Sequence, residues 1–296
     1  MAQQIVLLSN PTSGKGAGAR IGVQAAERLR ARGYDVLEVR GRDAEDALSL
    51  ASSRVEGGAD TLVVVGGDGM VHLALQAIGG SRARLGLVPA GTGNDVARYF
   101  DIPRGDVDAA VDVIVAGHER VTDLAVTGDR RYVTVLAAGF DAVVNERANA
   151  MRWPRGQARY TLATLAELRT LRPIPYTLEL DGRTEHLEAT MVAVGNGPSF
   201  GGGLRITEGA ELDDGLLDVV VIAPMSRREL LRTYPKLFRG THVHHPGFRR
   251  ERVRRVTVAA PGITAYADGE RVAALPLTIE VAPAALRMLA PERTTT

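Results

Sequence analysis

The sequence predicts two domains: an N-terminal α/β domain with a doubly wound parallel sheet, and a C-terminal antiparallel β-sandwich domain. In the first half, short and uniformly apolar runs alternate with helical segments, which is typical of parallel strands covered on both faces. In the second half, strand-like segments predominate, and the pairs Asp181-Gly182 and Asp268-Gly269 are strong signals for hairpin turns. A length of 296 residues is sufficient for two hydrophobic cores.

Strands followed by helices account for the first half. The strands are expected at residues 4–9, 34–40, 60–65 and 84–89. The helices are expected at residues 17–32, 43–55 and 67–78, and a further helix begins near Asp95. Sheets of this kind bind ligands at the carboxyl ends of their strands, so the loops that follow the strands form the candidate site.

The second half is predicted to be mainly antiparallel. Its strand-like segments lie at residues 131–139, 176–196, 216–224, 255–260, 263–273 and 275–283. Helical insertions are expected at residues 157–171 and 226–239. We therefore expect domains at residues 1–122 and 123–296, and the last segment can pack back on the first domain.

Composition limits the class of protein. Hydrophobic residues make up 45% and charged residues 24% of the chain, which are globular values. The net charge of +1 gives no overall attraction to nucleic acid, and the absence of cysteine excludes disulfides and thiolate metal sites. The N-terminus lacks the pattern of a signal peptide, and no apolar run approaches the roughly 20 residues of a membrane span. We expect a cytoplasmic protein.

Three glycine-rich loops follow the first, third and fourth expected strands. They span Asn10–Gly16, Gly66–Gly69 and Pro89–Asp95. Backbone amides without side chains, together with nearby hydroxyls, suit phosphate oxygens. Neither the P-loop spacing nor the dinucleotide-binding glycine pattern is present. Each loop alone is typical of a plain turn between strand and helix, but three at one sheet edge favour a phosphate site.

The motifs in these loops and beyond them resemble a known family. They are "NPTSGKG", "GGDGM", "PAGTGNDVAR", "AAGFDA", "GNGPSFGGGLRI", "AELDDGLLDVVVI" and "YADGE". In this order they resemble the catalytic domain shared by diacylglycerol kinases and sphingosine kinases, and most of all the bacterial diacylglycerol kinases. The resemblance covers essentially the whole chain. It implies a two-domain lipid kinase with ATP in the interdomain cleft and the lipid on the side of the β-rich domain.

The resemblance also implies the residues of the nucleotide site. They are Asn10, Pro11, Thr12, Ser13, Gly14, Gly66, Gly67, Asp68, Gly69, Thr92 and Asn94. Asp68 would hold the catalytic magnesium ion, directly or through water, and the glycines would let the backbone approach the phosphates. Two positions depart from the family pattern: Met70 replaces a threonine, and Leu73 stands where a carboxylate is common.

Two groups of carboxylates in the second half have both an ordinary and a functional interpretation. The segment 211–218 is typical of a solvated turn, whereas the resemblance implies a structural magnesium site formed by Asp214 with the carbonyls of Glu211 and Leu216. Asp268-Gly269 is typical of a type I′ turn. The resemblance implies instead that Glu270 is the general base and that Asp268 supports it, although the two roles can be exchanged.

A basic segment suggests contact with a membrane. Its cationic residues are Arg227, Arg228, Arg232, Lys236, Arg239, Arg249, Arg250, Arg252, Arg254 and Arg255. The segment is either a solvated face or a surface for anionic lipid. Trp153 is a candidate interfacial anchor, and the helix at 157–171 is either a lipid-facing lid or part of the core.

The sequence therefore predicts an ATP- and magnesium-dependent lipid kinase, peripherally associated with the membrane, that phosphorylates a hydroxyl of diacylglycerol or a related lipid. An inactive homologue that binds lipid or nucleotide is the first alternative, and a NAD kinase is the second. The sequence does not identify the lipid, and it leaves the oligomeric state open, including a homodimer.

Overall fold

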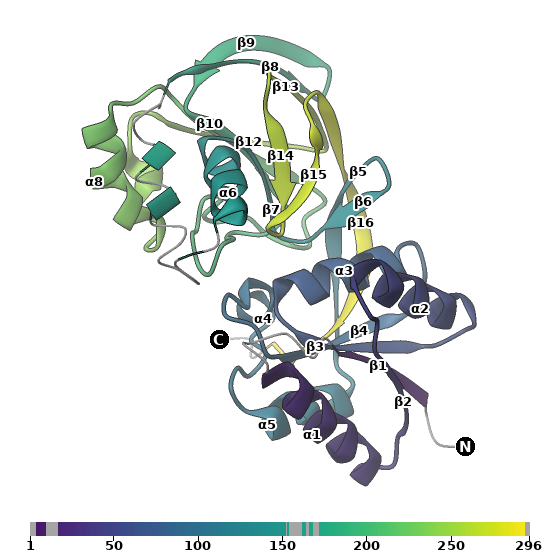
Figure 1. Cartoon of the computed structure of the whole chain (residues 1–296). Helices are drawn as coiled ribbons and strands as arrows, with labels where there is room; N and C mark the ends of the chain where they lie inside the picture. Colours follow the sequence, from purple (N-terminus) through teal and green to yellow (C-terminus); the bar gives the residue numbers. More distant parts are fainter. Residues whose placement is uncertain are drawn as a thin grey trace. The chain divides into compact units, whose positions relative to one another are not determined.

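The computed structural model describes residues 4–9, 17–151, 153, 162–163, 166–167 and 172–293 (Figure 1). The chain divides into two compact units. Unit 1 comprises Met1–Leu124 and Pro283–Thr296, and unit 2 comprises Ala125–Ala282. The chain passes between the units within strands β5 (Glu119–Thr127) and β16 (Leu277–Leu289).

Parallel strands form the centre of unit 1. They are β1 (Gln4–Ser9), β2 (Asp35–Val39), β3 (Thr61–Gly66) and β4 (Arg84–Pro89). Their order is β2-β1-β3-β4, and each neighbouring pair is parallel. All six residues of β3 are buried, which explains why the strand is apolar without alternation. The C-terminal part of β16 extends this sheet, because Met288 pairs with Leu85 of β4.

Helices cover both faces of this sheet, which confirms the predicted doubly wound α/β fold (Figure 1). The helices are α1 (Ala17–Ala31), α2 (Ala44–Glu56), α3 (Asp68–Ile78), α4 (Asp95–Tyr99) and α5 (Val107–Ala116). Helix α1 packs beside α5, and α2 packs beside α3. The carboxylates of Asp43 and Asp106 accept hydrogen bonds from amides in the first turns of α2 and α5, so both helices begin at side-chain caps.

Unit 2 is an antiparallel β-sandwich, as predicted. One sheet has the order β12-β11-β10-β7-β14-β15. Its strands are β7 (Val135–Gly139), β10 (Met191–Gly195), β11 (Leu217–Ile222), β12 (Phe248–Val253), β14 (Thr264–Ala267) and β15 (Glu270–Ala274). The second layer contains β8 (Ile174–Leu180), β9 (Arg183–Ala189), β13 (Arg255–Ala259) and the first part of β16, and β6 (Arg130–Tyr132) forms a hairpin with β5. Leu136 and Val219 of the first sheet share one core with Leu178 and Val256 of the second.

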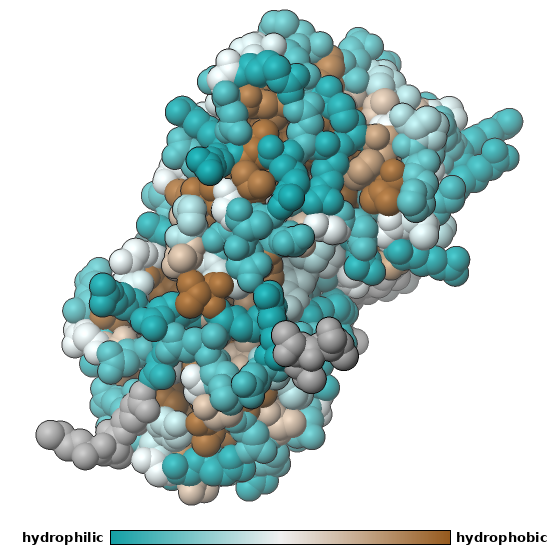
Figure 2. Space-filling model, turned by 180° about the vertical axis from the view of Figure 1, so that it is seen from behind, coloured by the Kyte–Doolittle hydropathy of each residue, from teal (hydrophilic) through white to brown (hydrophobic). Residues whose placement is uncertain are grey.

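Helices pack on the outer face of the six-stranded sheet. They are α6 (Phe140–Ala150), α8 (Arg227–Leu237) and the short 3-10 helix η2 (Thr241–His244) (Figure 1). A second apolar cluster lies under α8 and contains Met191 and Ile222, with Met225, Leu237 and Phe248 packed against it. Hydrophilic side chains cover most of the face shown in Figure 2, and smaller apolar patches interrupt them.

Both hairpin turns predicted from Asp-Gly pairs are present. The φ angles are 45° at Asp181 and 88° at Gly182, and 53° at Asp268 and 83° at Gly269. Two successive residues with positive φ define the type I′ turn, which suits the right-handed twist of the strands.

Within the described residues, five elements were not part of the sequence interpretation: α5, α6, η2, β5 and β12. The sequence of β12, "FRRERV", lacks the apolar alternation of a strand because it lies at the edge of its sheet. The helix expected at 157–171 lies largely outside the described residues. Trp153 is 79% exposed.

Candidate active site

The loop after β3 packs directly on the loop after β4. A Cβ atom added at Gly91 would lie 2.4 Å from the Cα atom of Gly67, and one added at Gly67 would lie 2.9 Å from the Cα atom of Gly91. Neither distance is compatible with a real side chain. Glycine is therefore needed at both positions so that the two backbones can touch, a reason that the sequence interpretation did not give. Asn10–Gly14 lie outside the described residues.

Asn94 closes the second loop on itself. Its side-chain Oδ1 accepts a hydrogen bond from the Gly91 amide at 3.1 Å, and its Nδ2 donates to the Gly91 carbonyl at 2.9 Å. Asn94 adopts the left-handed conformation, with φ 54°, which asparagine tolerates better than most residues. Thr92 is exposed. Asn94 therefore shapes the loop, while the Thr92 hydroxyl stays accessible.

Asp68 joins the two loop–helix junctions. It is the first residue of α3, and its Oδ1 accepts a hydrogen bond from the Val96 amide in α4 at 3.0 Å. The side chain is half-buried. This bond orients the Asp68 carboxylate toward the start of α4. Asp95, the first residue of α4, is buried and forms an ion pair within that helix with Arg98 at 3.0 Å.

In unit 2, the turn between β14 and β15 is tied to the segment before β7. The Oδ1 atom of Asp268 accepts hydrogen bonds from the amide of Thr134, at 3.3 Å, and from its hydroxyl. Thr134 is buried, and its carbonyl accepts the amides of Asn196 and Gly197, both at 2.9 Å. Three segments distant in sequence therefore fix the position of one carboxylate.

Glu270 has a different environment from Asp268. It is the first residue of β15, pairs across the hairpin with Ala267, and is exposed. Among the described residues it forms no ion pair. The hairpin thus presents one carboxylate that is held in place and one that is accessible to a reactant.

A buried tyrosine lies close to the Asp268 charge. Tyr132 is fully buried and donates a hydrogen bond from its hydroxyl to the Val194 carbonyl at 3.1 Å. Burial raises the pKa of the Tyr132 phenol well above its ordinary value, and the charge of Asp268 adds to the shift. Tyr132 consequently stays a neutral donor.

The acidic turn at 211–218 faces basic side chains of β12. Asp214 accepts the Leu216 amide at 2.9 Å and forms an ion pair with Arg252. Asp218 is 1% exposed and pairs with Arg250. Burial raises the pKa of the Asp218 carboxyl, and the hydrogen bond from Arg250 opposes this shift. The interpretation of this segment as a simple solvated turn is wrong for Asp218.

The described residues contain no cluster of three His, Cys, Asp or Glu side chains that could hold a metal. The two magnesium sites expected from the sequence, at Asp68 and at Asp214, use one carboxylate each, so a search for clusters does not test them. Each is judged instead by the surroundings of its carboxylate. Asp68 suits magnesium because it is a half-buried carboxylate at the junction of the two glycine loops. Asp214 suits it less well, because Arg252 already neutralises the charge. Glu211 is exposed.

Sequence reasoning missed the residues that hold the carboxylates. Thr134 has no local signal, because its contact with Asp268 joins positions 134 residues apart. The Val96 amide is a backbone group, so no residue type reveals its role. Arg250 and Arg252 were noticed as cations but not as partners of the acidic turn.

Both units of this fold, the α/β unit with its glycine loops and the antiparallel sandwich with its carboxylate hairpin, match known family models. The family model "Diacylglycerol kinase catalytic domain" matches residues 4–127, and "YegS C-terminal NAD kinase beta sandwich-like domain" matches residues 134–290. A diacylglycerol kinase of Mycobacterium tuberculosis is 45% identical over 294 residues, which cover 97% of this chain and 95% of the relative. The chain therefore belongs to the diacylglycerol kinase family, as its motifs predicted.

More distant relatives share the fold. A diacylglycerol kinase of Staphylococcus aureus is 27% identical over 280 residues, covering 93% of this chain and 89% of the relative. A crystal structure of a diacylglycerol kinase from Bacillus anthracis superposes with a TM-score of 0.75 at 19% identity, covering 98% and 97% of the two chains. An NAD kinase from Archaeoglobus fulgidus in complex with ATP gives a TM-score of 0.53 at 16% identity, covering 98% and 94%. In the described part of the chain, no helix has the length and apolar character that crossing a membrane requires.

Proposed function

We propose that this protein is an ATP-dependent lipid kinase that transfers the γ-phosphate to a hydroxyl of diacylglycerol or a related lipid. The relatives that match almost the whole chain are named diacylglycerol kinases. The observation that carries the proposal is the hairpin at Asp268 and Glu270, where an accessible carboxylate stands beside one that is fixed. A hydroxyl acceptor requires such a carboxylate to receive its proton.

In this proposal, unit 1 binds the nucleotide. The backbone of Gly66–Gly69 and the hydroxyl of Thr92 contact phosphate oxygens, and the predicted residues Asn10–Gly14 complete the set. Asn94 contributes indirectly, since its side chain shapes the loop that carries Thr92. Asp68 would hold magnesium, which neutralises charge on the phosphates when bound.

Unit 2 provides the groups that act on the lipid. Glu270 accepts the proton of the lipid hydroxyl as the oxygen attacks the γ-phosphate, and the bond between the γ-phosphorus and the bridging oxygen breaks to release ADP. Asp268 cannot turn freely because Thr134 binds its Oδ1 from both the amide and the hydroxyl. It supports Glu270 by orienting the substrate hydroxyl.

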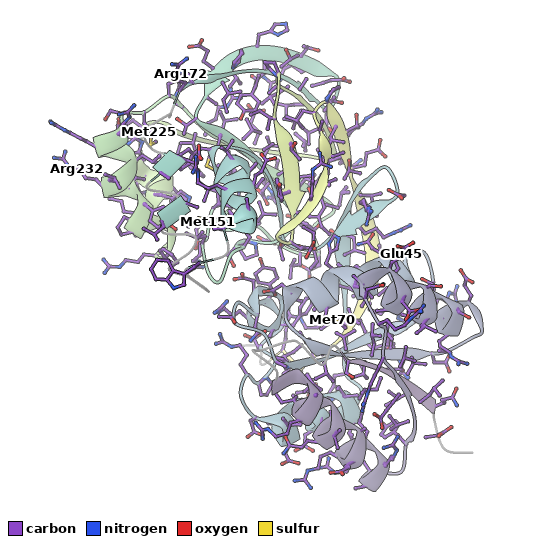
Figure 3. The ribbon with its side chains drawn as sticks, viewed as in Figure 1. Glu45, Met70, Met151, Arg172, Met225 and Arg232 are labelled. Atoms are coloured by element: carbon purple, nitrogen blue, oxygen red, sulfur yellow. The ribbon has the colours of Figure 1, made fainter. Side chains whose placement is uncertain are left out.

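The departure at Met70 does not by itself favour an inactive homologue. Met70 is 7% exposed and packs within α3, so its side chain contributes to the core of unit 1 (Figure 3). A threonine in its place would remove apolar contacts there. The similarity to the NAD kinase is one of fold.

The test is transfer of labelled γ-phosphate from ATP to mixed micelles that contain one lipid at a time. The panel includes diacylglycerol, ceramide, a sphingoid base and phosphatidylglycerol, with NAD as a parallel acceptor. Labelled lipid that depends on both ATP and magnesium supports the proposal. Labelled NAD, or no labelled product with any acceptor, contradicts it.

A further inference from the structure

The inner face of helix α8 packs against the rest of unit 2. The capping box of Ser226 and Glu229 fixes its start, with Ser226 accepting the Glu229 amide at 3.2 Å. Leu230 and Thr233 are buried against the outer face of the six-stranded sheet. The apolar cavity beneath the helix measures about 30 Å³, so it has no room for a ligand. Any binding by α8 must therefore use its outer face.

The outer face of α8 exposes large apolar side chains. Leu231 is 48% exposed and Phe238, at the end of the helix, is 42% exposed. They are seven residues apart, which places them on one side of the helix. The Tyr234 ring packs edge-on against Phe238, with ring centroids 5.8 Å apart, and so holds the Phe238 side chain in place.

Cations flank this apolar pair. Within the described residues, Arg228, Arg232, Lys236 and Arg239 form no ion pair, and Arg232 points away from the strands in Figure 3. Glu229 is the acidic residue of the helix, and it contacts His245 at 3.2 Å and the backbone of the cap. The charge of this face is therefore not cancelled locally.

The rest of the basic segment behaves differently. On β12, Arg249 pairs with Glu185, Arg250 with Asp218, and Arg252 with Asp214. On β13, Arg255 contacts Glu280 at 3.2 Å. These ion pairs cancel most of the charge that the sequence suggested for residues 249–255. Among the described residues of this segment outside α8 and its flanks, only Arg254 forms no ion pair.

We propose that the outer face of α8, formed by Leu231 and Phe238 with Arg228, Arg232, Lys236 and Arg239, docks on the surface of an anionic lipid bilayer. An exposed apolar pair with uncancelled cations around it complements a surface that is apolar below and anionic above. A nucleic acid would match the cations but not the apolar pair. An acidic protein would match the charge, but docking on it would not bring the enzyme to its lipid substrate. The choice of a bilayer rests on the proposed lipid kinase function, but the binding itself can be measured without activity.

Co-sedimentation with vesicles tests the docking. The vesicles are phosphatidylcholine alone and an equimolar mixture with phosphatidylglycerol. One variant carries Arg228→Gln, Arg232→Gln and Lys236→Gln, and a second carries Leu231→Ser and Phe238→Ser. A charge-matched control carries Arg54→Gln, Arg82→Gln and Arg104→Gln, which are exposed residues of unit 1. Thermal melting confirms that each variant is folded.

The wild type and the control are expected to bind the anionic vesicles in preference to phosphatidylcholine. The charge variant should lose at least about tenfold in affinity, and the apolar variant should also bind more weakly. Unchanged binding by both α8 variants overturns the docking surface. Activity on a dispersed short-chain diacylglycerol separates the two proposals. A protein that binds vesicles through α8 but phosphorylates no lipid contradicts the kinase function and leaves the docking surface standing.

Discussion

Asp68 in unit 1 and Asp268 in unit 2 are both held by an amide from a distant part of the chain, yet their surroundings differ. Asp68 begins a helix next to two loops whose backbones touch at Gly67 and Gly91. Asp268 lies in a two-residue turn and is bound by the amide and hydroxyl of Thr134. The site around Asp68 depends on the backbone contact between Gly67 and Gly91, so the fold requires glycine at these two positions. The second depends on side-chain hydrogen bonds, so substitutions there can separate chemistry from folding.

The largest effect is expected from Asp68. Asp68→Ala should abolish phosphoryl transfer, because it removes the charge proposed to hold magnesium. Asp68→Asn keeps an acceptor for the Val96 amide and should be equally inactive while melting close to the wild type. The measurement is turnover at saturating magnesium together with thermal melting. Near-normal turnover of either variant would remove Asp68 from the mechanism.

The next comparison lies within the hairpin of unit 2. Glu270→Gln keeps the size of the side chain and removes the base, so kcat should fall on the order of 10²–10⁴-fold with little change in ATP affinity. Asp268→Asn tests the exchanged role. If Glu270→Gln retains most of its kcat and Asp268→Asn does not, Asp268 is the base. Two active variants would leave this hairpin as an ordinary turn.

Thr134 allows a smaller and more specific change. Thr134→Val removes the hydroxyl that binds Asp268 but keeps the shape of the side chain, so kcat should fall about tenfold. Thr134→Ser restores the hydroxyl and should recover most of the activity. The pH profile of kcat provides a second readout. A Thr134→Val enzyme with the wild-type rate and profile would show that Asp268 needs no such support.

The backbone contact in unit 1 predicts a loss of stability. Gly91→Ala forces apart the loops after β3 and β4, and overpacking of this kind costs about 1–3 kcal/mol. Thr92→Ala, at the exposed neighbouring position, should change the free energy of unfolding by less than about 0.5 kcal/mol. Denaturant unfolding without nucleotide measures both. If Gly91→Ala loses ATP affinity but no stability, the glycines serve the phosphates instead of the contact between loops.

The smallest effect concerns the acidic turn. If Asp214 binds a structural magnesium ion, the melting temperature of the wild type should rise with magnesium. The free energy of unfolding should increase by about 1.4 kcal/mol at a magnesium concentration ten times the dissociation constant. Asp214→Ala should not respond. Arg252→Gln removes the competing cation and should strengthen the response. Equal magnesium responses in all three proteins would exclude the site.

Strands and hairpin turns could be predicted closely because their signals are local. The runs at 4–9 and 84–89 coincide with β1 and β4, since each has an apolar centre without alternation and is followed by turn residues. The Asp-Gly pairs required nothing beyond their own two residues. The charged strand β12 could not be predicted, because its arginines are accommodated by carboxylates elsewhere in unit 2.

The candidate site was predictable in its residue types and not in its contacts. The motifs indicated Asp68, Asp268 and Glu270, and these positions lie at a strand-to-helix junction and in a hairpin turn. The sequence could not show that Thr134 binds Asp268 or that Gly67 touches Gly91, because both contacts form when separate segments come together. It also could not separate the paired arginines of β12 from the cations of α8.

The last strand has a consequence for the order in which the chain can fold. Unit 2 is continuous in sequence, whereas the sheet of unit 1 gains a strand from residues 283–289, where Leu286 and Met288 are fully buried beside β4. During synthesis, every residue of unit 2 leaves the ribosome before unit 1 receives its final strand. Unit 2 is therefore an insertion that can fold while its host domain is still incomplete. A chain that ends a few residues before Met288 would lack the final strand of unit 1, whereas the sandwich of unit 2 would be complete.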